Sequence, residues 1–443
     1  MTDEQYMARA LTLAAKAIGH THPNPMVGAV IVKDGRIIGE GYHHKAGQAH
    51  AEVNALNAAS EEAKGATLYV TLEPCAHYGK TPPCAKRVVE SGIRRVVVSV
   101  VDPNPLVAGK GIAMLEAAGI EVTVGVLQAE CTKLIEGFLI YIKIKRPFVT
   151  LKSAMSLDGK IATKLNESQW ITNEFARKDG HVLRATHDAI LVGIGTVLAD
   201  NPSLTARLSY EDVASQVTAP WKQSIEAHHK VEEYESYQNN VEAQQHNAEV
   251  QRHSAEGEQH NPEEEQHSAE AQQHKGESLY SQHQGLDVHQ PDVIILDSLG
   301  RTPSDGKVFS QSQRQVHIFV STRCDTAAIQ RLTKAGATVH VVAEDPTGLV
   351  LVDVLSILGE LGYTSLLVEG GSHIVANFMV QKCFDKIITY VGNILIGGED
   401  ALSAMAGTGI GHLTEAPKLE FTDVKILHNN LRIEAYHMER SGR

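Results

Sequence analysis

Three candidate metal ligands, His50, Cys75 and Cys84, constrain this chain more than any other feature, because a bound metal would bring three separate segments together. His50 begins the tripeptide His50-Ala51-Glu52, and each of the two cysteines directly follows a proline. One imidazole and two thiolates leave the fourth position of a tetrahedral zinc open, which is typical of a catalytic rather than a structural site. The pattern therefore predicts that zinc activates water in the first part of the chain.

Glu52 stands two residues after His50, at a predicted helix start, so its carboxylate can lie beside the metal without binding it. A carboxylate in that position can take a proton from water and pass it to a ring nitrogen and then to a leaving amine. Buried core cysteines and a helix-capping histidine would explain each residue alone, but they do not explain the combination. A structural zinc lacks an evident fourth ligand, since the nearest spare thiol, Cys131, lies in a helix-like segment.

Hydrophobic periodicity predicts two α/β regions, residues 1–146 and 147–443, which we interpret as two domains. The first region opens with a helical stripe of apolar residues from Met7 to Ile18 and contains a hairpin turn at Asp34-Gly35. Its other predicted elements are strands at 27–32, 36–39, 67–72, 96–101 and 120–124, and helices at 51–59, from 83, and at 111–118. The second region has predicted strands at 148–154, 189–192, 293–296, 316–320, 339–342 and 366–368, and helices at 327–334, 352–361 and 374–380.

A polar segment, residues 222–289, interrupts the second region between two of its predicted strands. It holds 14 acidic residues against 4 basic ones and 9 of the 23 histidines, and histidine recurs every seventh residue from His246 to His274. The repeats lack an apolar seam for a coiled coil, and abundant Gln and Glu with Pro262 favour a disordered His/Glu/Gln-rich insert. A polar helix and a histidine-rich metal reservoir remain open alternatives. A long insert is tolerable within a domain because loop-closure entropy grows slowly with length.

Composition argues against several other classes of protein. The chain has 443 residues, 5 cysteines and a formal net charge of −13. The sequence contains no run of about 18 apolar residues, so it predicts no membrane span. The acidic N-terminus does not resemble a signal peptide. The few, odd-numbered cysteines fit a reducing cytosol, so we expect a cytoplasmic protein. Most of the negative charge lies in the insert, so the argument against nucleic acid as a partner depends on the motifs.

The pairing of His-x-Glu with two Pro-Cys sites resembles the zinc nucleobase deaminases, although here eight residues separate the cysteines. That longer loop, with the upstream segment His22-Pro23-Asn24-Pro25-Met26-Val27-Gly28, resembles the deaminase half of the bifunctional deaminase/reductases of riboflavin biosynthesis. The resemblance implies a cytidine-deaminase-like three-layer fold, zinc bound by His50, Cys75 and Cys84, and Glu52 as the proton shuttle. It also makes four residues candidate contacts to the pyrimidine or the ribose phosphate, namely Asn24, His43, His77 and Lys80. Ordinary loop roles remain open for these four.

Two glycine pairs in the second region raise the question of a dinucleotide site. Gly193-Ile194-Gly195 follows an apolar strand, but Leu198 stands where a Rossmann fingerprint requires glycine, so this signal is weak. Gly370-Gly371 is better placed between a strand and a helix, where backbone N–H groups and the helix dipole can receive a phosphate. A tight turn that requires glycine explains the second pair equally well.

The second region also resembles the reductase half of the same family, whose fold is similar to that of dihydrofolate reductase. The segments that carry the resemblance are Lys152-Ser153-Ala154, Ser156-Leu157-Asp158-Gly159-Lys160, Trp170-Ile171-Thr172, Thr196-Val197-Leu198-Ala199-Asp200-Asn201-Pro202 and Val368-Glu369-Gly370-Gly371. It implies NADPH contacts at Ala154, Trp170, Thr196, Asp200, Ser298, Gly371, Ser372, His373, Ile374, Val375, Ala376 and Asn377. It implies substrate contacts at Lys152, Ser168, Arg184, Leu204, Arg207 and Glu369. Arginines suit a sugar phosphate, while a surface role for Arg184 and a core role for Trp170 remain open.

The motifs together predict two consecutive reactions: hydrolytic deamination of a phosphoribosylated diaminopyrimidinone, then NADPH-dependent reduction of its ribosyl group to ribityl. A tRNA or nucleoside deaminase fused to an unrelated domain would explain neither the cysteine spacing nor the reductase motifs. A non-catalytic scaffold whose insert is the functional part is the alternative from another class, and the intact zinc pattern argues against it. We expect a small-molecule substrate and neither nucleic acid nor membrane as a partner. The residues alone do not decide whether the chain forms a homo-oligomer or whether it prefers NADPH to NADH.

Overall fold

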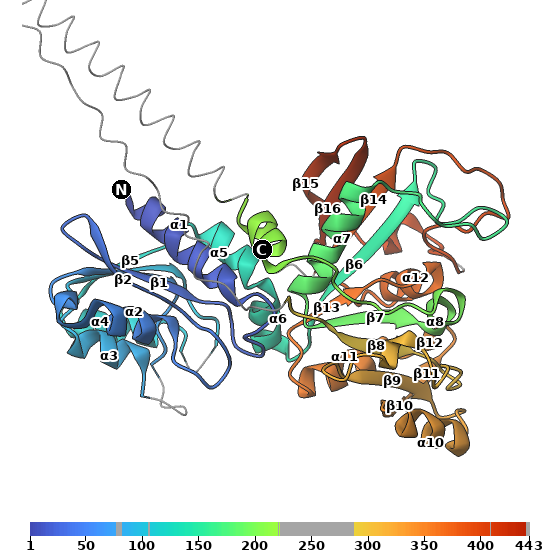
Figure 1. Ribbon diagram of the computed structural model, residues 1–443, viewed down its shortest axis with the longest axis horizontal. Helices are drawn as coiled ribbons and strands as arrows, with labels where there is room; N and C mark the ends of the chain where they lie inside the picture. The colour runs from blue at the N-terminus through green and yellow to red at the C-terminus, as the bar shows by residue number, and fades with distance from the viewer. Residues whose placement is uncertain (77–81, 105–106, 220, 222–287, 408, 440–443) are drawn as a thin grey trace, which may run out of the picture. The chain divides into compact units, whose positions relative to one another are not determined.

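The computed structural model describes residues 1–443 apart from 77–81, 105–106, 220, 222–287, 408 and 440–443 (Figure 1). The chain divides into two units, one of residues 1–217 with 288–443 and the other of residues 218–287. The predicted insert lies outside the described residues except for Val288 and His289. Within the described part of the chain, no helix is both long and apolar enough to cross a membrane.

A five-stranded sheet forms the centre of the first region. The strand order is β2-β1-β3-β4-β5, in which β1 is antiparallel to both of its neighbours and β3, β4 and β5 are parallel. The strands are β1 (Gly28–Lys33), β2 (Arg36–Tyr42), β3 (Thr67–Leu72), β4 (Arg95–Val100) and β5 (Glu121–Val124). β1, β3 and β4 are buried almost throughout, as expected for strands covered on both faces.

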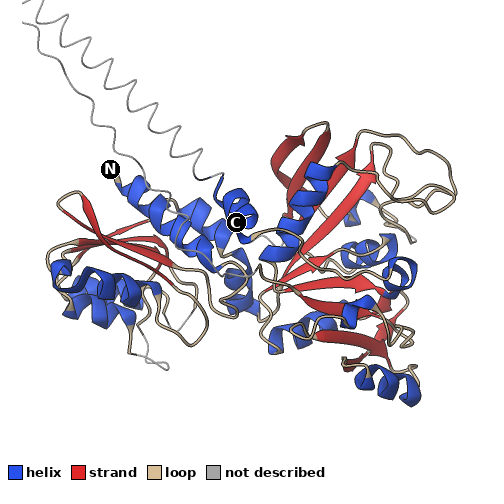
Figure 2. Cartoon of the chain, viewed as in Figure 1, coloured by secondary structure: helices blue, strands red, loops and turns tan. Residues whose placement is uncertain are grey.

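Helices cover both faces of this sheet and give a three-layer arrangement. α1 (Asp3–Ala14) lies on one face, and α2, α3 and α4 lie on the other (Figures 1 and 2). Gly39 and Gly41 of β2 allow α2 to lie close, because a Cβ at either position would collide with the backbone of that helix. The remaining helices are α2 (Ala51–Ala59), α3 (Cys84–Glu90), α4 (Lys110–Ala117), α5 (Gln128–Leu134) and α6 (Glu136–Ile144), with 3-10 turns at Ala15–Ala17 and Ser60–Ala63.

A nine-stranded sheet forms the centre of the second region. The order is β10-β9-β8-β7-β13-β6-β14-β16-β15, parallel from β10 to β14 and antiparallel for the last two strands. The strands are β6 (Phe148–Ser156), β7 (Ala189–Gly193), β8 (Asp292–Leu296), β9 (Val316–Ser321), β10 (Thr338–Val342), β13 (Ser365–Val368), β14 (Lys386–Gly392), β15 (Leu419–Leu427) and β16 (Asn430–His437). β11 (Glu344–Asp345) and β12 (Gly348–Leu349) form a separate hairpin.

Two apolar clusters pack against this sheet. One includes Leu191, Phe319 and Phe378, and the other includes Ile190, Ile318 and Leu332. The helices are α7 (Glu174–Thr186), α8 (Ile194–Asp200), α10 (Thr326–Lys334), α11 (Leu351–Glu360) and α12 (Ser372–Val380), together with residues 210–219 and 3-10 turns at Lys307–Phe309 and Leu413–Glu415.

The structure departs from the predicted elements in several places, and α6, α7 and α8 have no predicted counterpart. The predicted first helical stripe extends to Ile18, but α1 ends at Ala14 and a 3-10 turn follows at Ala15–Ala17. Gly19, in a left-handed conformation (φ 74°), then leads into the loop. The predicted strands stop at residue 368, whereas β14, β15 and β16 extend the second sheet by three more.

Candidate functional sites

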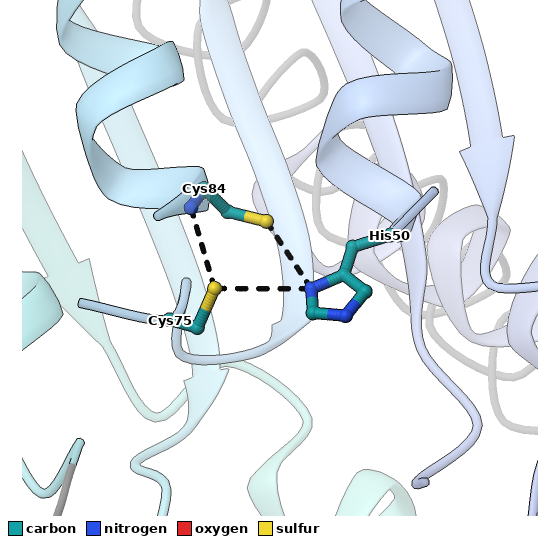
Figure 3. A group of neighbouring side chains, drawn as sticks. All are labelled: His50, Cys75 and Cys84. Atoms are coloured by element: carbon teal, nitrogen blue, oxygen red, sulfur yellow. Dashed lines mark hydrogen bonds between the residues drawn. The ribbon is translucent and has the colours of Figure 1, made fainter. Parts of the chain in front are cut away.

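Three segments that are far apart in the sequence bring His50, Cys75 and Cys84 together (Figure 3). His50 is the N-cap of α2, Cys75 follows the carboxyl end of β3, and Cys84 is the first residue of α3. His50 Nδ1 lies 3.2 Å from Cys84 Sγ and 3.8 Å from Cys75 Sγ, and the three ligand atoms all lie within 4.8 Å of one another. Zinc bonds of about 2.0 Å to nitrogen and about 2.3 Å to sulfur fit ligand atoms spaced in this way.

The surroundings of Cys75 stabilise a thiolate. Its sulfur accepts a hydrogen bond from the backbone N–H of Cys84 (3.3 Å). Hydrogen bonds from Cys84 and from the ring of His50 lower the pKa of Cys75 to about 4, against the opposing effect of burial. One imidazole and two cysteine sulfurs grouped at these distances form a donor set that fits zinc.

Glu52 lies in the first turn of α2 with its side chain only 3% exposed. Burial raises the pKa of Glu52 to about 7, although the nearby His50 acts in the opposite direction. His50, Glu52 and Cys75 all line one cavity of about 520 Å³. The carboxylate is therefore placed to exchange protons with a molecule bound in that cavity.

Asn24 and His43 form another part of the cavity wall. The Asn24 side-chain nitrogen lies 3.0 Å from His43 Nε2, and His43 Nδ1 lies 3.1 Å from the carbonyl oxygen of Ala49. The imidazole therefore donates through Nδ1 and accepts through Nε2, as a neutral ring does. Burial also favours the neutral ring, because it lowers the pKa of His43. Both residues were predicted as substrate contacts, whereas His77 and Lys80 lie outside the described residues.

Sequence reasoning missed several residues of the cavity wall, among them Asp102, Asn104, Phe138 and Tyr141. Asp102 and Asn104 follow the end of β4, which is parallel to β3 and adjacent to it. Because the carboxyl ends of parallel strands meet at one edge of a sheet, the polar residues that follow the predicted strand 96–101 could have been predicted to line the site beside Cys75. Phe138 and Tyr141 lie on α6. The sequence around them does not indicate a site, since an aromatic residue on an apolar helix is normally interpreted as a core residue.

A second cluster of charges lies at the carboxyl edge of β13. Arg184 of α7 donates two hydrogen bonds to the carboxylate of Glu369, at 2.7 and 2.8 Å, and a third to the carbonyl oxygen of Thr205 at 3.1 Å. Lys152 Nζ of β6 lies 3.7 Å from the same carboxylate. Burial raises the pKa of Glu369, but the charges of Arg184 and Lys152 outweigh it and lower the pKa to about 2. Three predicted substrate contacts are therefore brought together.

The other predicted substrate contacts differ in exposure. Arg207 is exposed, and it lies near His181, whose pKa is lowered to about 4 by burial and by the charges of Arg184 and Arg207. Leu204 is buried in the core, and its carbonyl oxygen accepts a hydrogen bond from Arg314 (3.0 Å). Ser168 is exposed, and no described contact joins it to the Glu369 cluster.

Several predicted NADPH contacts lie around the starts of α8 and α12. Gly371 is the N-cap of α12, and a Cβ on Gly371 would lie 3.7 Å from Thr196 Oγ1 of α8. The N-terminal backbone of α12 thus presents N–H groups next to Thr196, which suits a phosphate. Along the predicted segment, Gly371 and Ile374 are partly exposed and His373 is exposed, while Ser372, Val375 and Ala376 are buried and the Asn377 side chain donates to the carbonyl of Thr347 (2.6 Å).

The remaining predicted NADPH contacts come from four other segments. Ala154 is on β6, Asp200 ends α8, and Ser298 follows β8. The Trp170 side chain is 65% exposed, and the guanidinium of Arg177 lies 4.3 Å from its ring centre. Trp170 is therefore an exposed surface residue rather than a core residue.

Comparison with known proteins matches each half of the chain to a known protein family. The cytidine and deoxycytidylate deaminase zinc-binding region matches residues 1–100, and the RibD C-terminal domain matches residues 147–241 and 243–432. The riboflavin biosynthesis protein RibD of Bacillus amyloliquefaciens is 39% identical over 433 residues, which cover 98% of this chain and 96% of that protein. The chain belongs to the RibD family.

Other RibD proteins agree with this assignment. The RibD protein of Escherichia coli strain K12 is 36% identical over 425 residues, or 96% of both chains. The solved structure of Acinetobacter baumannii RibD matches with a TM-score of 0.72 at 33% identity, covering 98% of both chains. The bifunctional deaminase/reductase of Thermotoga maritima matches with a TM-score of 0.70 at 32% identity over 98% of both chains.

As a RibD protein, the chain is a bifunctional enzyme of riboflavin biosynthesis, a hydrolytic deaminase with zinc and a reductase with NADPH. This confirms the predicted pair of activities, the two cofactors and the mixed α/β fold with a cytidine-deaminase-like first part. The boundaries 1–146 and 147–443 and the roles of the individual residues stay predictions.

Proposed function

We propose that the first half deaminates 2,5-diamino-6-(5-phosphoribosylamino)pyrimidin-4(3H)-one and that the second half reduces the ribosyl group of the product to ribityl. The final product is 5-amino-6-(5-phosphoribitylamino)uracil. The observation that carries the first step is the cluster of His50, Cys75 and Cys84 beside a cavity that His50, Cys75 and Glu52 line. The Thermotoga maritima relative is named for the deaminase and reductase of this same pair of reactions.

In the proposed deamination, His50, Cys75 and Cys84 hold zinc, which when bound supplies a Lewis acid that activates water. Glu52 takes a proton from the water and returns protons to the ring nitrogen and the departing ammonia. Asn24 contacts the pyrimidine at the cavity wall, and the neutral ring of His43, held by the carbonyl of Ala49, orients the Asn24 side chain. Water adds to the carbon that bears the amine, the carbon–nitrogen bond breaks, and a carbonyl replaces the amine.

In the proposed reduction, NADPH when bound would supply the hydride that ribose C1′ receives, while the bond from C1′ to the ring oxygen would break and that oxygen would take a proton. Lys152, Arg184 and Glu369 bind the sugar phosphate and the pyrimidine edge at the end of β13. No nucleophile is needed, so positioning of the cofactor and the substrate carries most of the rate enhancement.

The full chain is expected to release ammonia from the phosphoribosylated diaminopyrimidinone and then to oxidise one NADPH per ammonia released. A chelator that removes zinc is expected to abolish ammonia release while NADPH oxidation on the deaminated intermediate continues, because the metal ligands all lie in the first region. Ammonia release measured in a coupled assay and NADPH absorbance would check both steps. Ammonia release that survives complete zinc removal would contradict the proposed mechanism.

We also propose that the enzyme is cytoplasmic, acts without nucleic acid and forms a homo-oligomer through β15. β15 is an edge strand, and Phe421, Val424 and Ile426 are 60–73% exposed. A β-bulge after Phe421 keeps these three side chains on one face of the sheet, opposite Ala435, Ile433 and Leu431 of β16. This face carries no charged residue on β15, so contact with a second copy would bury no unpaired charge.

Substitution Val424→Glu is expected to convert the oligomer to a monomer, because each interface would then bury two like charges. Light scattering after size-exclusion chromatography measures the mass directly. Lys425→Glu, on the opposite face of the same strand, is the matched control and should leave the mass unchanged. A parent chain that is monomeric at every concentration would contradict this proposal.

A further inference from the structure

Glu73 is a buried carboxylate that the proposed mechanism does not use. It lies between β3 and the metal-ligand segment that begins at Pro74-Cys75, and its side chain is 3% exposed. Its backbone N–H donates to the carbonyl oxygen of Val100 (2.9 Å), which extends the pairing of β3 with β4 by one residue. A buried carboxylate is costly unless it receives hydrogen bonds, so its partners indicate its role.

Four backbone N–H groups donate to this carboxylate. Oε2 accepts from Asp102 (3.2 Å) and Gly109 (2.9 Å), and Oε1 accepts from Gly111 (2.9 Å) and Ile112 (3.2 Å). Gly111 and Ile112 lie in the first turn of α4, whose N–H groups have no partner within the helix. One side chain therefore caps α4 and holds the other end of the preceding loop at the same time.

The loop that Glu73 holds supplies part of the cavity wall. Asp102, Asn104 and Val107 all line the cavity that contains the metal ligands. The first turn of α4, which follows this loop, lies directly against the metal-ligand segment, because a Cβ at Gly111 would collide with the carbonyl oxygen of Pro74. Although Glu73 borders the cavity, both of its carboxylate oxygens are occupied by backbone donors and face the loop.

We propose that Glu73 is a positioning residue for substrate binding in the deaminase, which fixes the wall formed by Asp102, Asn104 and Val107 through the four backbone N–H groups. This inference rests on the proposed function, because it takes the cavity as the pyrimidine site. Glu73 acts through the loop and touches neither the metal nor the reacting carbon.

Substitution Glu73→Gln tests the proposal with little change in volume. A glutamine offers one oxygen, and its NH₂ group would face two N–H donors, so at least two of the four hydrogen bonds are lost. The expected result is a KM for deamination raised roughly tenfold or more, with kcat changed much less, because loss of hydrogen bonds to a charged group loosens the wall rather than the proton shuttle. Zinc content and NADPH oxidation should match those of the parent chain.

Hydrogen–deuterium exchange supplies a readout that needs no substrate. The amides of Gly111 and Ile112 are expected to exchange faster in Glu73→Gln, because their acceptor is weakened. Glu116→Gln, an exposed position on the same helix, is the matched control and should change neither exchange nor KM. A parent enzyme inactive on this pyrimidine would refute the proposed substrate, and the exchange measurement would still decide whether Glu73 anchors the loop.

Three results would overturn the proposal. Unchanged KM and exchange would show that the carboxylate does not hold the wall, and loss of zinc would show that it holds Cys75 instead. A raised KM with no change in exchange would place its effect elsewhere. Should Glu73→Gln fail to fold, as judged by circular dichroism, Glu73→Asp keeps the charge but draws the carboxylate back from the four N–H donors, and an unchanged KM in that folded variant would refute the inference.

Discussion

Replacing Glu52 by glutamine is expected to lower kcat for deamination by about three orders of magnitude, within the range that general acid–base catalysis contributes. The substitution preserves the size of a side chain that is 3% exposed in the first turn of α2, so packing and the adjacent His50 should be little disturbed. Glutamine cannot take a proton from water or return one to the leaving ammonia. Single-turnover ammonia release, measured on zinc-loaded protein, checks the rate directly.

The second activity of the same chain supplies a control for this experiment. NADPH oxidation should be unchanged, because α2 belongs to the first region whereas the predicted reductase residues belong to the second, and zinc content should stay at the parent value. Glu61→Gln, an exposed position just beyond α2, should leave both activities intact. Deamination within a factor of about ten of the parent rate would remove Glu52 from the role of proton shuttle.

Elements with strong local patterns could be predicted from the sequence. The helix 51–59 and the strand 67–72 have the bounds of α2 and β3, since apolar periodicity and flanking glycine or polar residues define both ends. β15 and β16 were missed because their charged residues mislead a pattern based on hydrophobicity, whereas β14, with Lys386 as its one charged residue, is an apolar run that could have been recognised. Arg432 and Glu434 of β16 are buried, yet they pair with each other at 2.9 Å, and Arg432 also pairs with Asp179 of α7 at 3.0 Å.

The two sites differ in how far local sequence could reveal them. His50, Glu52, Cys75 and Cys84 belong to short motifs whose residue types already imply zinc chemistry, so their convergence could be expected before any fold was known. Lys152, Arg184 and Glu369 come from β6, α7 and the end of β13, with more than 200 residues of sequence between the first and the last. Only the strand order β7-β13-β6 brings them together, and no periodicity specifies that order.

Replacing Arg184 by methionine is expected to abolish most of the reductase activity and to lower the free energy of unfolding by about 3 kcal/mol. Arg184 and Glu369 form a bidentate pair whose side chains are 18% and 10% exposed. Without the guanidinium, Lys152 at 3.7 Å is the ion-pair partner that the described residues still offer the carboxylate, so a buried charge is left poorly compensated. Denaturant unfolding and NADPH oxidation measure the two effects, while ammonia release should persist. Lys178→Met, which removes an exposed ion pair on the same helix, should change stability by at most about 0.5 kcal/mol.

The pH dependence and a double variant separate the pair's structural role from its binding role. The lowered pKa of Glu369, about 2 against 4.5 when unfolded, adds stability that is present above 4.5 and is lost as the pH falls toward 2. In Arg184→Met the pKa of Glu369 should rise, so this contribution to stability should shrink and its loss on acidification should begin at a higher pH. Arg184→Met combined with Glu369→Gln removes both charges and should recover part of the stability but none of the reductase activity. Recovery of activity in the double variant would show that the pair only supports the fold and does not bind substrate.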